Sequence, residues 1–123
     1  MKPIIKGAAF TLSLALFVIL MCASENHAQT PDPAARGKAL YQGHCASCHG
    51  ISGAGNGMDA TGMNPAPTNL TSAQVMGAIS DNDIEQAILA GVPNSAMHGY
   101  GTILSPDEVA ALKAYVRSLS VTQ

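Results

Sequence analysis

The 123-residue sequence contains no tryptophan and few other aromatic residues. Its two phenylalanines, Phe10 and Phe17, both lie in the first 28 residues, so the remainder holds only Tyr41, Tyr100 and Tyr115. Aromatic rings normally supply much of the buried area of a small domain, and a domain of this size often needs a metal, a disulfide or another cross-link. The scarcity of rings therefore predicts that a large apolar cofactor fills part of the core.

Charged residues are also scarce, at 11% of the sequence, and neither sign dominates. Six basic residues stand against eight acidic ones, and the basic residues are scattered along the chain. Proteins that bind nucleic acid concentrate Lys and Arg on one face or segment. We therefore expect no nucleic-acid partner. The length leaves room for one small domain, which must contain the functional site.

One long apolar run is present near the start of the chain. Residues 7–23 carry no charge, follow two lysines and precede candidate cleavage sites after Ser24 and Ala28. This order predicts a signal peptide over residues 1–28, a mature domain over residues 29–123, and export, in a bacterium to the periplasm. The alternative is an uncleaved segment that anchors the domain, because the run is close to the lower limit of about 17 residues for crossing a bilayer.

The mature region shows helix signals and no alternating strand pattern. Asp32 followed by proline predicts a helix that begins near Pro33 and ends just before a cysteine motif. Capping patterns at Ser80 and Ser105 predict two more helices. The helix that starts at Ser80 ends near residue 91, and the helix that starts at Ser105 continues to about residue 119. Residues 50–70 are rich in glycine and proline and are expected to form a long loop. The predicted fold class is all-α.

The motif itself is Cys45-Ala46-Ser47-Cys48-His49, a C-x-x-C-H pattern typical of covalent attachment of haem c. Two thiols at this spacing can each add to one vinyl group of the same porphyrin, and the histidine that follows is then held against the iron. A thiol redox pair or half of a zinc site are the alternatives. A zinc site fits poorly, because no cysteine follows Cys48 and adjacent Cys48 and His49 could hardly both bind one tetrahedral ion. A thiol redox pair fits poorly, because a thioredoxin-like motif needs a βαβ context that the sequence does not show.

With these features in order, residues 32–119 resemble a small class I cytochrome c. The shared order is a first helix with Gly37 and Tyr41, the C-x-x-C-H motif, a proline-bearing loop, a helix that ends in Gly-Val-Pro, a methionine and a last helix. The resemblance implies a cytochrome c fold of three to five short helices around one covalently bound haem. It also implies that Gly37 and Tyr41 pack against the last helix.

The resemblance further implies the ligands of the iron, which are His49 and, from the segment 91–100, Met97. A His/Met pair is an established arrangement in cytochromes c. His98 stands where the family commonly has proline, so it is a rival ligand. Pro65 or Pro67 is expected to supply the carbonyl that accepts the Nδ1–H of His49 and orients its ring. Other methionines could also serve as ligands, and these are Met58, Met63 and Met76.

An iron with both axial positions filled by protein cannot readily bind substrate, so the expected function is one-electron transfer between redox partner proteins and not catalysis. No grouping typical of hydrolytic catalysis is visible. The domain is expected to act as a monomer or as a subunit of a redox complex, with a membrane contact only if residues 7–23 are retained. The alternatives are an electron-transfer subunit of a dehydrogenase or terminal oxidase and, if Met97 binds weakly, a haem enzyme or gas sensor.

Overall fold

The computed structural model describes residues 32–121, and the predictions about a signal peptide or anchor in residues 1–28 lie outside them. The described part is helical, which confirms the predicted all-α class, and it contains no strand. None of its helices combines the length and the apolar character needed to cross a membrane. The helices, in chain order, are α2 (Pro33–His44), α3 (Ala46–His49), η1 (Met58–Ala60), α4 (Ala73–Gly77), α5 (Asp81–Ala90) and α6 (Pro106–Ser118).

The three longer helices begin where their capping residues predict. Asp32 accepts a hydrogen bond from the main-chain N–H of Ala34, and Pro33 occupies the first position of α2. Helices α5 and α6 each begin with a complete capping box, in which a serine and an acidic residue three positions later satisfy each other's main-chain N–H. Helix α5 ends at Gly91, which has a positive φ of 79°. Local chemistry therefore determines these boundaries.

The acidic residue of the α6 capping box, Glu108, also forms an ion pair with Arg36 of α2 at 3.0 Å. The main-chain N–H of Ser105, the Arg36 guanidinium and the Ser105 hydroxyl lower the pKa of Glu108 from 4.5 to about 2. A carboxylate whose pKa is lower in the folded than in the unfolded chain stabilises the fold above its ordinary pKa. That contribution disappears as the pH falls toward the folded-state value.

Glu108→Gln is therefore expected to reduce the free energy of unfolding at neutral pH and to have a shrinking effect as the pH falls from about 4.5 to about 2. Denaturant titrations across this pH range measure the difference from the wild type. Asp107→Asn is the matched control, since Asp107 is exposed in the same helical turn and makes no ion pair with the described residues. A difference that stayed constant down to pH 2 would contradict the role of the Glu108 carboxylate.

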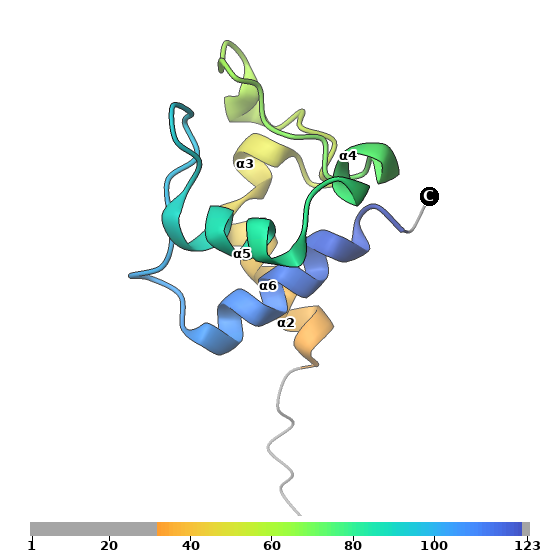
Figure 1. Ribbon diagram of the computed structural model, residues 1–123, viewed down its shortest axis with the longest axis vertical. Coiled ribbons are helices and arrows are strands. Elements are labelled where there is room, and N and C mark those ends of the chain that lie inside the picture. Colours follow the sequence, from red (N-terminus) through yellow and green to blue (C-terminus); the bar gives the residue numbers. More distant parts are fainter. Residues whose placement is uncertain (1–31, 122–123) are drawn as a thin grey trace, which may run out of the picture. The chain divides into compact units, whose positions relative to one another are not determined.

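Helices α2 and α6 cross closely (Figure 1). A Cβ atom on Gly37 would overlap the main-chain carbonyl oxygen of Ala111 and lie 2.9 Å from Tyr115 Cβ. One helical turn farther along α2, the ring of Tyr41 is completely buried and lies 5.3 Å from that of Tyr115. The predicted contact of Gly37 and Tyr41 with the last helix is confirmed. Tyr41 is joined in the core by Leu70, Met76, Ile84, Ile88, Leu104, Val109, Leu112 and Val116.

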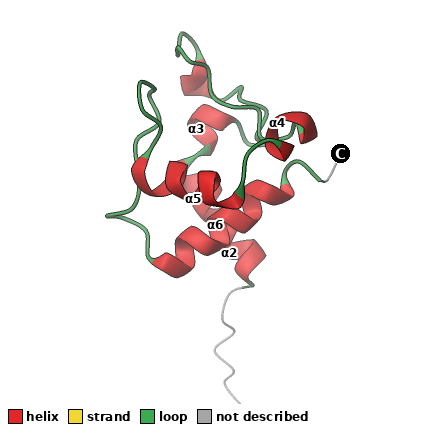
Figure 2. Ribbon diagram, in the orientation of Figure 1, coloured by secondary structure: helices red, strands yellow, loops and turns green. Residues whose placement is uncertain are grey.

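Long connecting segments join the helices (Figure 2). The predicted loop over residues 50–70 is present, interrupted only by the short 3₁₀ helix η1. The sequence reasoning missed α4, which is only five residues long and is capped by Ser72 accepting from the main-chain N–H of Val75. A helix this short has too few turns to show an apolar period.

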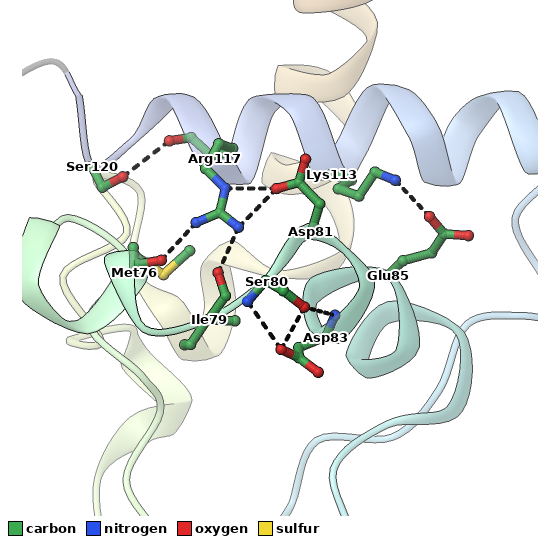
Figure 3. A network of polar contacts seen from close by, with 9 residues as sticks. All are labelled: Met76, Ile79, Ser80, Asp81, Asp83, Glu85, Lys113, Arg117 and Ser120. Carbon is green, nitrogen blue, oxygen red and sulfur yellow. Dashed lines mark hydrogen bonds and ion pairs between the residues drawn. The ribbon is translucent and has the colours of Figure 1, made fainter.

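Arg117 of α6 binds the segment that connects α4 to α5 through hydrogen bonds and an ion pair (Figure 3). Its guanidinium donates to the carbonyl oxygens of Met76 and Ile79, both at 2.7 Å, and forms an ion pair with Asp81 at 2.8 Å. The planar, forked donor set of arginine suits such a multiple contact, which a lysine ammonium could not reproduce. One side chain thus links the start of α5 to α6.

Candidate cofactor site

A pocket opens between α3, the loop after η1 and the loop between α5 and α6. It contains about 740 Å³ of empty space, part of it open to solvent. None of the residues around it is Asp, Glu, Lys or Arg. The lining residues are His44, Cys45, Cys48, His49, Met63, Pro65, Ala66, Pro67, Thr68, Val92, Ser95, Ala96, Met97, His98 and Tyr100. Both cysteines of the motif, His49, Met97 and the two loop prolines therefore line one pocket.

The two thiols come from the single helical turn of α3 and the residue before it. Cys45 and Cys48 are both half-buried and unpaired. Burial, followed by the proximity of Cys48, raises the pKa of the Cys45 thiol to about 11. Before any modification, Cys45 is therefore an uncharged thiol at neutral pH, and it faces a predominantly apolar space.

The main chain of the motif is held from several sides. The N–H of Gly57 donates to the carbonyl of Cys48 at 3.0 Å, and the N–H of Gly55 donates to that of His49 at 2.7 Å. From α2, the Tyr41 hydroxyl donates to the carbonyl of Gly50 at 2.7 Å. Burial raises the pKa of Tyr41 well above its ordinary value, so this phenol remains a donor. The turn that presents the thiols and the imidazole is therefore rigidly supported.

The ring of His49 is oriented by a main-chain carbonyl, but the residue differs from those expected. Nδ1 lies 3.0 Å from the carbonyl oxygen of Thr68, and neither Pro65 nor Pro67 supplies the acceptor. The loop passes the imidazole one residue after Pro67, while both prolines line the pocket. Because a carbonyl can only accept, Nδ1 carries the proton in this contact and Nε2 keeps its lone pair for a metal.

The structure separates the four candidate methionines into two groups. Met97 and Met63 line the pocket, whereas Met58 is 93% exposed and Met76 is buried in the hydrophobic core. His98, the rival ligand, also borders the pocket, but its side chain is exposed and its ring lies 4.7 Å from that of Tyr100. The thioether of Met97 thus shares one cavity with the two thiols and the imidazole.

The segment that carries Met97, residues 91–100, is a short hairpin-like loop and is called the Met97 loop below. Gly91 and His98 form an isolated antiparallel bridge, and the N–H of Val92 donates to the carbonyl of Met97 at 3.0 Å. The Ser95 hydroxyl donates to the carbonyl of Val92 at 2.7 Å and accepts from the N–H of Met97 at 3.1 Å. The loop therefore holds its own shape.

Tyr100 is a site residue that the sequence reasoning did not identify. Its hydroxyl donates to the carbonyl of His44 at 2.9 Å, and its ring contacts the imidazoles of both His44 and His98. Burial raises the pKa of Tyr100, so the phenol keeps its proton. The only sequence signal was the rarity of aromatic residues in this chain.

These residues fit a covalently bound haem. The pocket offers two thiols at the attachment spacing, an imidazole whose Nδ1 is already occupied, and a soft thioether. A structural zinc site fits less well, because residues 32–121 contain no group of three or more His, Cys, Asp or Glu side chains able to hold an ion. The donor set therefore favours haem over the alternatives considered for the C-x-x-C motif.

Comparisons with known proteins give the same answer. The family model described as Cytochrome c matches residues 34–120, which is more than half of the chain. No curated protein gives a significant match. A chain of the Kuenenia stuttgartiensis reducing HAO-like protein complex Kustc0457/Kustc0458 is similar to this one, with 34% identity and a TM-score of 0.59. The match covers 68% of this chain and 41% of that chain.

Two further solved structures are similar. The KustC0563 c-type cytochrome is 32% identical with a TM-score of 0.58, and the match covers 68% of this chain and 95% of that chain. Dihydro-heme d1 dehydrogenase NirN in complex with DHE is 28% identical with a TM-score of 0.55, and the match covers 67% of this chain and 16% of that chain. The match thus covers less than half the length of two of these three chains.

The covalent haem c expected from the motif is confirmed by the family match. The fold, the pocket and the family match agree, and this chain belongs to the cytochrome c family.

Proposed function

We propose that this domain is a one-electron carrier, attached to its haem through Cys45 and Cys48, with His49 and Met97 as the two iron ligands. When bound, the haem supplies an iron that alternates between the ferric and ferrous states. The observation that carries the proposal is the arrangement of the chain's own donors in one pocket, with the His49 ring oriented by the carbonyl of Thr68.

Met97 contributes a property that the other residues do not. A thioether is a soft ligand that favours the ferrous state, so a His/Met pair gives a more positive potential than a His/His pair. Filling the sixth position also keeps small molecules from the iron, which supports a carrier and not a peroxidase-like enzyme or gas sensor. Met63 lines the same pocket, but it follows η1 and lies outside the loop expected to carry the ligand.

Met97→Ala is expected to abolish the far-red sulfur-to-iron absorption band of the ferric protein. It is also expected to lower the reduction potential, by a sizeable part of the roughly 0.8 V range that axial ligands control. Visible spectroscopy and a redox titration of the holoprotein measure both. Met63→Ala is the matched control, because it removes the same side chain from the same pocket. An unchanged spectrum in Met97→Ala, or a lost band in Met63→Ala, would contradict the assignment.

The carrier is proposed to work outside the cytoplasm, as a mature domain over residues 29–123 released from the signal in residues 1–28. Export agrees with the usual location of cytochromes c. Mass spectrometry of the mature, natively expressed holoprotein gives the N-terminus and the added haem mass in one experiment. Retention of residues 7–23 together with recovery in the membrane fraction would favour the anchored alternative.

A second candidate is an electron-transfer subunit within a larger redox assembly. Two of the similar solved chains favour it: one belongs to a protein complex, and in the other the matched region is only 16% of the chain, a dehydrogenase. The chemistry at the haem would be the same, but electrons would pass to a fixed neighbour. Co-purification of the tagged protein from its source separates a diffusing monomer from a bound subunit.

A further inference from the structure

The hydroxyl of Tyr100 connects two parts of the chain that carry different functional residues. It donates to the main-chain carbonyl of His44 at 2.9 Å, across 56 positions of sequence. His44 is the last residue of α2 and directly precedes Cys45, whereas Tyr100 follows Met97 by three positions. The hydrogen bond therefore joins the Met97 loop to the segment that bears the thiols, and both of its residues line the pocket.

The other hydrogen bonds of the loop do not cross the pocket. Those of residues 92–97 remain within the loop, and the main-chain N–H groups of Tyr100 and Gly101 donate to carbonyls at the end of α5, those of Ile88 and Leu89. Within residues 32–121, the Tyr100 hydroxyl makes the one hydrogen bond that joins this loop to the α2 side of the pocket. The loop is thus held at its base by hydrogen bonds to the end of α5, and a single hydrogen bond, that of the Tyr100 hydroxyl, attaches it to the α2 side of the pocket.

The ring of Tyr100 is well placed to keep this contact. Its centroid lies 5.4 Å from that of His44, in an edge-on arrangement, and 4.7 Å from that of His98. The phenol ring therefore contacts one imidazole on each of the two segments that its hydroxyl joins. A phenylalanine could keep the ring contacts, but only a tyrosine can make the hydrogen bond.

We propose that Tyr100 is a positioning residue that holds the Met97 loop closed over the cofactor pocket through its hydrogen bond to the His44 carbonyl. This inference rests on the proposed function, in which Met97 is an iron ligand. When the bond is broken, the loop is free to swing about its base at the end of α5, and Met97 leaves the iron more often. Tyr100 would then control how readily a foreign ligand reaches the metal.

The test uses the holoprotein in its ferric form and added imidazole, which competes with Met97 for the iron. The apparent affinity for imidazole is proportional to the fraction of molecules in which Met97 has left. A net hydrogen bond of ordinary strength changes such a fraction roughly two- to twelve-fold. Tyr100→Phe is therefore expected to tighten apparent imidazole binding by that factor, measured from the visible absorption spectrum.

Tyr115→Phe is the matched control, since its ring packs against Tyr41 and its hydroxyl makes no hydrogen bond to the described residues. It is expected to bind imidazole as the wild type does. Thermal unfolding is recorded for each variant. If Tyr100→Phe lowers the melting temperature but leaves imidazole affinity unchanged, Tyr100 is only structural and the proposal is wrong.

Met97→Ala separates this proposal from the one it rests on. If Met97 is a ligand, its removal strengthens imidazole binding far more than Tyr100→Phe does, because no protein ligand then competes. If Met97→Ala and the wild type bind imidazole equally, the axial assignment fails. If Met97→Ala binds tightly while Tyr100→Phe behaves as the wild type, the assignment of Met97 stands and the role of Tyr100 is rejected.

Discussion

Gly37→Ala is expected to destabilise the folded protein by about 2–3 kcal/mol, because the added Cβ has no room at the crossing of α2 and α6. It would overlap the carbonyl oxygen of Ala111 and lie 2.9 Å from Tyr115 Cβ. Alanine is favoured over glycine inside a helix by roughly 1 kcal/mol, so this gain is smaller than the loss. The obstructing atom belongs to the main chain and cannot rotate away, so the helices must separate.

Denaturant unfolding of the holoprotein, followed by far-UV circular dichroism, measures this loss. Gly43→Ala is the control, because Gly43 lies in the same helix with nothing within 4 Å of an added Cβ. It should gain a few tenths to about 1 kcal/mol from helix propensity alone. Equal stabilisation by both alanines would show that the crossing is not tight in solution.

The second large effect is expected from Cys45→Ser, Cys48→Ser, which removes both attachment points. The cofactor-free chain should lose most of its helical signal, because the described core has only one fully buried aromatic ring, that of Tyr41. Without a cofactor, the walls of the pocket would also expose apolar surface to water. Circular dichroism at 25 °C, with haem absorption measured in parallel, checks both losses.

Ser47→Ala is the control for this variant, since it alters the same turn but leaves both thiols in place. Its haem content and helicity should match those of the wild type. Native-like helicity in the double variant without haem would contradict the idea that the porphyrin completes the core. The protein part of the fold would then be sufficient by itself.

Much of the fold could be predicted because the three longer helices carry their boundaries locally. Asp32, Ser80 and Ser105 cap helices through atoms only two or three residues away, so the signals are visible in the sequence. Helix α4 is also capped locally, by Ser72, but its five residues are too few to show the apolar repeat that would identify a helix. Its position depends on tertiary contacts, including the two main-chain carbonyls that Arg117 holds from 38 to 41 residues away.

In the candidate site too, local sequence patterns could be predicted, whereas contacts between distant segments could not. The spacing of Cys45, Cys48 and His49 is a local pattern, whereas the role of Met97 came from family resemblance and stays a prediction. The sequence predicts Pro65 or Pro67 as the acceptor for His49, whereas the acceptor is the carbonyl of Thr68. Which carbonyl faces the imidazole depends on the path of the loop and not on residue type. The contact of Tyr100 with His44 likewise depends on how two distant segments meet.

No Asp, Glu, Lys or Arg lines the pocket, and this affects how another protein would dock at this face. Charged rims attract partners from a distance and make the encounter rate fall steeply as ions are added. Without them, association is expected near the uncharged range of about 10⁵–10⁶ M⁻¹s⁻¹, set by shape and by the removal of water from apolar surface. Electron exchange through this face would then proceed at similar rates in dilute and in saline surroundings.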